Sequence, residues 1–294
     1  MSILLTGATG FIGSSVLRHL IEEGHSVAAL VRDASKASVV EAAGATALVG
    51  DARDADLVAA AAEASDGVIH LASAHDVDAE FITGVFRGLE GSDKPFVHTG
   101  GIWTYGDNGD ITEHSPADPP AITAWRGVGE TRVRSAEGIR TVIVVPTVVY
   151  GRGTGIPNVL VHAPLGDGAA PALQLVGDGT QHWATVHVED LAALYILAFE
   201  HGTPGSTYIG ASGDNPTVRD LGEAIAVAAG IAGGVEAQTV EETRDRLGAG
   251  FADALLLDQQ ARGATPRIDL GWEPNEATLL DELANGSYAR GAAV

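Results

Sequence analysis

The octapeptide TGATGFIG, at residues 6–13, lies between an apolar segment that predicts a short buried strand and a segment that predicts an amphipathic helix. At such a junction Gly7 allows a tight turn, Gly10 lets the backbone approach a pyrophosphate, and Gly13 permits close packing of helix on strand. The N–H groups and the positive dipole end of the helix then face the phosphates. Glycine is common in this chain, with 38 in 294 residues, so the position of the motif carries the argument rather than its spacing.

Segments typical of strands and helices continue to alternate along the chain, and the strands are apolar along their whole length. This pattern indicates a parallel sheet that is covered on both faces. We therefore expect an α/β fold with a doubly wound, Rossmann-type sheet. The expected strands are 3–6, 27–31, 46–49, 67–71, 95–100, 140–146 and 206–209, and the expected helices are 11–23, 35–43, 54–64, 77–90, 189–200 and 217–229.

The composition of the sequence changes after Tyr150. Glycine and proline become frequent there, and loops are expected to dominate. We expect residues 1–150 and 184–210 to form the nucleotide-binding domain. Residues 151–183 and 211–294 are expected to form a smaller C-terminal lobe that binds substrate.

Composition limits the partners. With 39 acidic against 17 basic residues, the formal net charge of −22 repels nucleic acid and anionic lipid, so we expect neither as a partner. The chain has no cysteine, no run of 18 apolar residues and no recognisable targeting segment, which favours the cytoplasm. The expected partner is a small-molecule substrate, and a homodimer is left open. No spacing of His, Asp and Glu indicates a metal site, so no metal is expected.

Six motifs in order resemble a known family, the extended short-chain dehydrogenase/reductases, also called the NAD-dependent epimerase/dehydratase family. They are TGATGFIG (6–13), VGDARD (49–54), VIHLASA (68–74), VVPTVVYG (144–151), VHVEDLA (186–192) and LGWEP (270–274). The resemblance implies a bound dinucleotide, with Asp51 at the adenine. The residues that it places at the cofactor, together with those expected at the ribose phosphate, are Gly7, Thr9, Gly10, Phe11, Ile12, Gly13, Arg32, Lys36, Asp51, Ala52, Leu71, Ala72, Ser73, Thr99, Pro146, Val148 and Val149.

The choice between NAD and NADP depends on the end of the second strand. Members that prefer NAD carry there an acidic residue that binds the ribose hydroxyls, and this position falls on Val31, followed by Arg32. A guanidinium can bind a 2′-phosphate with charge-assisted hydrogen bonds, and Lys36 can add a second charge. The alternative is that Asp33 is the acidic partner, shifted by two residues. We expect NADP, with NAD as the alternative.

The family's catalytic pattern is not matched. Its proton donor is a Tyr-x-x-x-Lys pair, but neither lysine lies four residues after any of the five tyrosines. A helix expected over residues 122–136 puts Ile122 at the tyrosine position and Arg126 at the lysine position. A second register puts Trp125 and Gly129 there. The family's serine position falls on Gly101. The sequence therefore resembles an atypical branch of the family.

Other residues must then do the chemistry. Tyr105 is the first candidate for the proton donor, with a pocket-wall aromatic as the alternative reading. Thr99 is a nearby hydroxyl, and Arg126 can hold the nicotinamide ribose, although its pKa is too high for acid–base work. The residues expected at the substrate are Trp103, Tyr105, Trp125, Tyr150 and His75.

These features together predict an NADP-dependent oxidoreductase that acts on a small carbonyl or alcohol through a non-standard site. One alternative is an epimerase, dehydratase or other lyase that uses bound cofactor transiently. Another is a non-enzymatic sensor that binds NADP(H).

Overall fold

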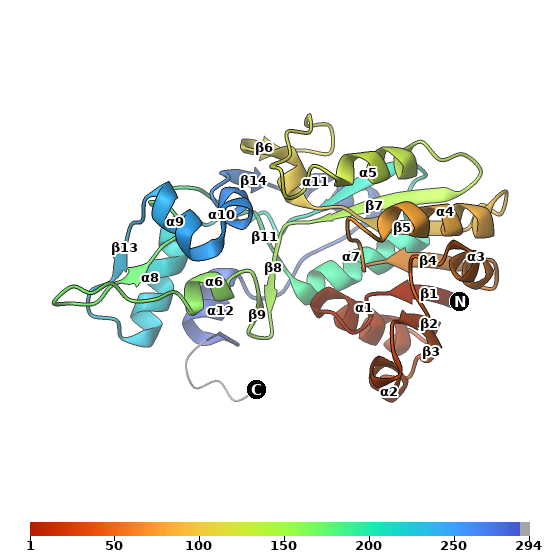
Figure 1. The fold of residues 1–294 in the computed structure, drawn as a ribbon, viewed down its shortest axis with the longest axis horizontal. Coiled ribbons are helices and arrows are strands. Elements are labelled where there is room, and N and C mark those ends of the chain that lie inside the picture. Colours follow the sequence, from red (N-terminus) through yellow and green to blue (C-terminus); the bar gives the residue numbers. More distant parts are fainter. Residues whose placement is uncertain (289–294) are drawn as a thin grey trace.

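A computed structural model of the chain describes residues 1–288. Seven parallel strands form its central sheet, and the predicted doubly wound α/β fold is confirmed (Figure 1). The strand order is β12 (Ser206–Gly210), β7 (Arg140–Pro146), β5 (Pro95–Thr99), β4 (Gly67–His70), β1 (Ser2–Thr6), β2 (Ser26–Val31) and β3 (Thr46–Val49). The direction of winding reverses between β1 and β4, and ligands bind at such a switch point in open α/β sheets.

Helices cover both faces of this sheet because its strands bury side chains on both sides. Along β1, Ile3 and Leu5 belong to one buried cluster, whereas Leu4 belongs to the other. The first face is covered by α1 (Phe11–Glu22), α2 (Ala34–Ala42), α7 (Val188–His201) and α11 (Ala264–Leu270). The second is covered by α3 (Ala55–Glu63), α4 (Asp78–Leu89) and α5 (Arg126–Arg134).

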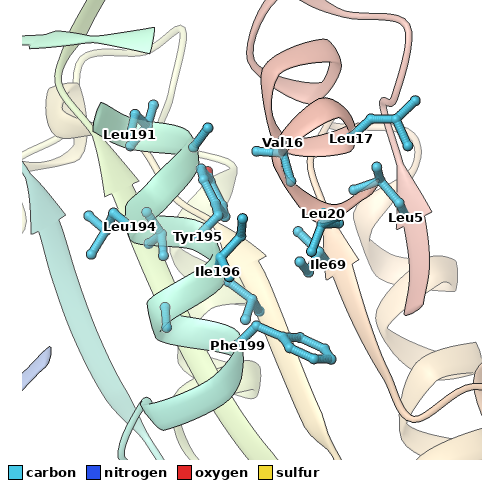
Figure 2. Packing of buried hydrophobic residues seen from close by; sticks show 14 of the residues in the cluster. Leu5, Val16, Leu17, Leu20, Ile69, Leu191, Leu194, Tyr195, Ile196 and Phe199 are labelled. Carbon is cyan, nitrogen blue, oxygen red and sulfur yellow. The ribbon is translucent and has the colours of Figure 1, made fainter. Parts of the chain in front are cut away.

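Close packing between α1 and α7 fixes the start of α1 against the sheet. Figure 2 shows Val16 and Leu20 of α1 facing Ile196 and Phe199 of α7, and all four side chains are buried. Each fully buried side chain of this size stabilises the fold by about 1.5–3 kcal/mol relative to exposure. The phosphate loop that precedes α1 therefore rests on a rigid support.

A third buried cluster lies away from the sheet, in the part of the molecule drawn largely in green and blue (Figure 1). It is formed by β8 (Val148–Gly151), α6 (Asn158–Val161), β10 (Leu173–Gln174), α8 (Val218–Ala229), β13 (Val235–Glu236), α9 (Val240–Leu247), α10 (Ala249–Leu255) and α12 (Leu279–Asn285). The strands β11 (Thr185–His187) and β9 (Thr154–Gly155) pair with β8. A 3₁₀ turn (Ile102–Tyr105) and the paired strands β6 (Asn108–Ile111) and β14 (Gln259–Ala261) complete the elements of residues 1–288. The division of the chain at residues 150, 184 and 210 stays a prediction, and Leu270 and Trp272, expected in the lobe, pack with the sheet.

One predicted helix is shorter than expected. Residues 121–125 form turns, and α5 begins only at Arg126, whose N–H donates to the Thr123 carbonyl. The N–H groups of Thr123 and Ala124 both donate to the Pro120 carbonyl, which closes a separate turn before α5 begins. The consequence is that Arg126 lies in the first turn of α5 rather than in its middle.

Among residues 1–288, no helix combines the length and the apolar character needed to cross a membrane.

Candidate functional site

The loop after β1 has the backbone that its glycines predict. Gly7 adopts φ 72°, in the left-handed region, and a Cβ there would lie 2.9 Å from the Leu71 carbonyl carbon. A Cβ on Gly13 would lie only 2.0 Å from the Gly7 oxygen, so α1 packs directly on the turn. Gly10 precedes α1 and offers no side-chain cap. The backbone N–H groups at this helix start are therefore available to a phosphate.

A cleft of about 450 Å³ opens beside this loop, at the carboxyl ends of β1, β2 and β4. This volume lies in the range of small-molecule sites. The structure brings together there nine of the residues that the sequence places at the cofactor: Gly7, Thr9, Arg32, Lys36, Asp51, Ala52, Leu71, Ala72 and Ser73. Gly10, Phe11, Ile12 and Gly13 belong to the adjoining start of α1.

Positive charge gathers at the β2 end of the cleft. Arg32 and Lys36 both line it, and so does Arg53, which sequence reasoning missed although it lies within the VGDARD motif. Arg53 holds Asp51 through Nε–Oδ1 and Nη2–Oδ2 bonds of 3.0 and 2.6 Å. The side-chain hydrogen bond from Arg53 lowers the pKa of Asp51 to about 2.

Asp33, the alternative partner for the ribose, has another role in the structure. Its Oδ1 accepts hydrogen bonds from the backbone N–H groups of Ser35 and Lys36, at 3.0 and 3.1 Å, and from the Ser35 hydroxyl. Asp33 is thus the N-cap of α2. The Ser35 hydroxyl, followed by the Lys36 N–H, lowers the pKa of this exposed carboxyl.

A second, smaller pocket of about 190 Å³ lies where the sheet meets the lobe. Of the predicted site residues, Trp103, Arg126, Pro146 and Val148 line it. Sequence reasoning missed its remaining wall, which consists of Gly101, Ile102, Thr123, Thr147 and Ile156. Thr147 lies inside the quoted VVPTVVYG motif, whereas the turn that carries Thr123 had been assigned to a helix.

Arg126 is fixed in this pocket by bonds at one nitrogen. Its Nη1 donates to Ser73 Oγ at 2.8 Å and to the Thr99 carbonyl at 3.2 Å. The guanidinium also lies over the Trp125 ring, 4.5 Å from its centroid, in a cation–π contact. Ser73 in turn donates to Asp78 Oδ2 at 2.7 Å.

Beneath Ser73 lies a buried polar cluster of His70, Asp78 and His98. Their ligand-type atoms all lie within 4.8 Å of one another, a grouping that the sequence spacing did not indicate. Thr6 Oγ1 accepts the N–H groups of Leu71 and Ala72 at 3.1 and 3.2 Å, which occupies both of its lone pairs. Its hydroxyl therefore donates to His70 Nδ1 at 2.7 Å. His70 then carries its proton on Nε2, which faces Asp78 Oδ1 at 3.3 Å.

Burial determines the charge state of this cluster. It lowers the pKa of both imidazoles, that of His98 to about 3, so both rings are neutral at neutral pH. Burial alone would raise the pKa of Asp78, but the hydrogen bonds from His70 and Ser73 help to lower it on balance. The cluster connects the end of β1 to Arg126 through Asp78 and Ser73.

Tyr105, the first candidate for the proton donor, does not line either pocket. It packs in the second buried cluster with 8% of its surface exposed, and burial raises the pKa of its hydroxyl to about 12. Thr99 is also turned away, because its hydroxyl donates to the His70 carbonyl at 2.7 Å and lies 2.9 Å from the Tyr195 hydroxyl. This geometry does not favour either residue as a catalytic group, and both assignments stay predictions.

Three residues expected at the substrate also lie outside the two pockets. Tyr150 is 1% exposed and donates to the Ala277 carbonyl at 2.8 Å. Trp125 and His75 contact each other edge to face, at 5.9 Å between ring centroids, and Trp125 supports Arg126 from behind. Val149, expected at the cofactor, packs in the first buried cluster.

Comparison with known proteins agrees with this geometry. A family model described as NAD(P)H-binding matches residues 7–148, and that of the NAD dependent epimerase/dehydratase family matches residues 94–210. An uncharacterized protein of Schizosaccharomyces pombe is 31% identical over 98% of this chain and 100% of its own length. A 2-alkyl-3-oxoalkanoate reductase of Stenotrophomonas maltophilia is 26% identical over 71% of this chain and 68% of its own.

Among solved structures, a DesIV double mutant, a dTDP-glucose 4,6-dehydratase from Streptomyces venezuelae with NAD and DAU bound, has the same fold. Its TM-score is 0.77 at 21% identity, over 99% of this chain and 98% of that one. Fold, phosphate loop and cleft define an NAD(P)-binding Rossmann protein. The chain belongs to the extended short-chain dehydrogenase/reductase family, which includes oxidoreductases, epimerases and dehydratases.

Proposed function

We propose that the protein is an NADP(H)-dependent oxidoreductase that interconverts a small carbonyl compound and its alcohol. NADP(H) is favoured over NAD(H) because three basic residues, Arg32, Lys36 and Arg53, lie at one end of the cleft. Within residues 1–288, the side chains of Arg32 and Lys36 make no ion pair, so both are available to a 2′-phosphate. Asp33, the alternative carboxylate for the ribose hydroxyls of NAD, caps α2 instead.

The second pocket is the proposed place of reaction. NADPH, when bound, supplies a hydride to the carbonyl carbon of the substrate. Arg126 is the only charged residue that lines this pocket within the described part of the chain, and its N–H groups stabilise the negative charge that develops on the carbonyl oxygen.

The product alcohol also needs a proton. Thr123 lines the same pocket, and its hydroxyl makes only a long 3.4 Å bond to the Pro120 carbonyl, whereas Thr147 donates to Gly210 at 2.8 Å. We propose that Thr123 Oγ1 passes its proton to the product oxygen and regains one from water. The similarity to a 2-alkyl-3-oxoalkanoate reductase supports the proposal that this protein also catalyses a reduction.

Arg32→Ala tests the cofactor assignment. Loss of a charge-assisted bond to the 2′-phosphate should weaken NADPH binding by about 1.5–3 kcal/mol, while NADH binding hardly changes. Fluorescence titration with both cofactors measures this, and Arg87→Ala, an exposed arginine paired with Asp56, serves as the control. An equal loss for both cofactors would contradict the NADP assignment.

Steady consumption of NADPH with a panel of small ketones tests the reaction itself. An epimerase or dehydratase regenerates its cofactor in each cycle, and a sensor consumes none, so neither alternative produces a sustained fall in NADPH absorbance.

A further inference from the structure

One edge of the Arg126 guanidinium is unused. Both structural bonds come from Nη1, which donates to Ser73 Oγ and to the Thr99 carbonyl. Within residues 1–288, Nε and Nη2 have no hydrogen-bond partner, and no carboxylate pairs with this side chain. The two parallel N–H donors of the Nε–Nη2 edge, and the second N–H of Nη2, are therefore left unpaired.

This edge of the guanidinium forms part of the wall of the second pocket. A Cβ on Gly101 would lie 3.7 Å from Arg126 Nε, and Gly101 and Arg126 both line the pocket. The absence of a side chain at Gly101 thus leaves Nε accessible from the pocket. The other lining residues are apolar, glycine or threonine, so the positive charge has no counterpart among them.

The guanidinium is also held in one orientation. Ser73 and the Thr99 carbonyl fix Nη1, and the Trp125 ring covers the guanidinium at 4.5 Å. Ser73 is itself fixed by its 2.7 Å bond to Asp78, which accepts the Ala74 N–H at 2.9 Å as well. A donor pair held in this way loses little conformational entropy when it binds a ligand.

We infer that the Nε–Nη2 edge of Arg126 is a carboxylate subsite, and that the substrate is a small oxo acid. This inference rests on the proposed function and names its substrate class. The two parallel donors of such an edge match the two oxygens of a carboxylate, whereas a neutral carbonyl uses only one donor. A partly buried charge facing apolar walls is costly unless an opposite charge binds it.

The ketone position follows from the same geometry. When the oxo group is one or two bonds from the carboxylate, its oxygen can reach the same guanidinium. The carbonyl carbon then gains the hydride and the carbonyl oxygen gains the proton, while the carboxylate is unchanged. A pocket of about 190 Å³ suits a short acid rather than a long chain.

Binding tests the subsite without turnover. Butanoate and butanamide have nearly the same shape and differ in charge, and both can be titrated by calorimetry into the protein saturated with NADP⁺. Butanoate should bind the wild type about 10- to 100-fold more tightly. Arg126→Met should remove this difference, Arg126→Lys should keep part of it, and Arg262→Met, at an exposed arginine, should preserve it.

NADP⁺ affinity supplies a separate check on each variant. It should be unchanged in Arg126→Met and Arg126→Lys, which also shows that both are folded. Equal binding of the two probes, binding of neither, or a preference that survives in Arg126→Met would each overturn the subsite. A loss of NADP⁺ affinity alone would assign Arg126 to the cofactor and would overturn it too.

Turnover separates this inference from the proposed function. The wild type should reduce 3-oxobutanoate with a higher kcat/KM than methyl 3-oxobutanoate. Arg126→Lys, which keeps a positive charge but not the paired N–H groups, should narrow the preference. Equal reduction of both ketones would overturn the carboxylate subsite while the reductase activity stands. If the protein binds butanoate preferentially but neither ketone causes NADPH to be consumed, the carboxylate subsite stands and the proposed reductase activity is contradicted.

Discussion

His70 and His98 are fully buried imidazoles at the ends of two adjacent strands, and they surround the carboxylate that fixes Ser73 and Arg126. His70 stacks on Phe81 at 3.9 Å between ring centroids, and His98 lies 5.6 Å from His70. Neutral rings are compatible with this burial, whereas a second positive charge next to Arg126 is not. The cluster therefore makes the stability of the molecule depend on pH.

His98 should be responsible for part of that dependence. Its pKa is about 3 in the fold, against an ordinary value of 6.5, mainly because of burial and secondly because of His70. Between these values the unfolded chain binds a proton that the folded chain does not, so stability is complete above about pH 6.5 and falls as the pH drops towards 3.

Denaturant unfolding at a series of pH values from about 6 to about 4.5 measures the effect. In His98→Gln the free energy of unfolding should fall less steeply, by up to about 1.4 kcal/mol per pH unit. His201→Gln, at an exposed histidine, is the control and should keep the wild-type slope. Identical slopes for all three proteins would contradict the prediction.

The junction of β1 with α1 shows how one element combines folding and binding. Gly10 and Gly13 both precede or begin the helix, yet a Cβ would meet very different surroundings at the two positions. At Gly10 the nearest atom would be the Gly7 oxygen at 3.2 Å, whereas at Gly13 the same oxygen would lie at 2.0 Å. One glycine keeps space for a ligand, and the other keeps space for the fold.

Gly10→Val and Gly13→Val should separate these roles. Gly10→Val should abolish dinucleotide binding, measured by fluorescence titration, and leave the melting temperature near that of the wild type. Gly13→Val should lower stability by about 3 kcal/mol or more, because backbone atoms must move to relieve the overlap. Unchanged titration curves for Gly10→Val would show that the loop serves another purpose.

At the scale of the whole molecule, the second pocket draws on segments that are far apart in the sequence. Trp103 and Arg126 come from segments that follow or cover the sheet, whereas Ile156 comes from the loop after β9. The same molecule carries a formal net charge of −22. Its folded state holds these charges closer together than its unfolded state does, so self-repulsion lowers its stability.

Salt should therefore stabilise the protein. Raising the NaCl concentration from about 10 mM to about 100 mM shortens the Debye length from about 30 Å to about 10 Å, which screens the repulsion. The melting temperature at pH 7 should rise, and KCl should have the same effect because screening is not specific to an ion. A fall in melting temperature would show that attractive ion pairs outweigh the net charge.

The sequence alone was sufficient for the sheet and the phosphate loop because both depend on local patterns. Apolar runs that alternate with helical segments predicted all seven central strands, and the glycines of TGATGFIG predicted the turn into α1. The residues after β2 and β4 were assigned to the cofactor by the family resemblance, and the structure places them in one cleft because parallel strands end at one edge of the sheet.

The partners of each polar side chain depended on tertiary structure. Arg126 meets Ser73 across 53 residues of sequence, and the Thr99 hydroxyl meets Tyr195 across 96. Tyr105 was expected in the pocket, but the short 3₁₀ turn that contains it directs the side chain into the core. Side-chain direction depends on the packing of distant segments against each other, and no local pattern of residues encodes that packing.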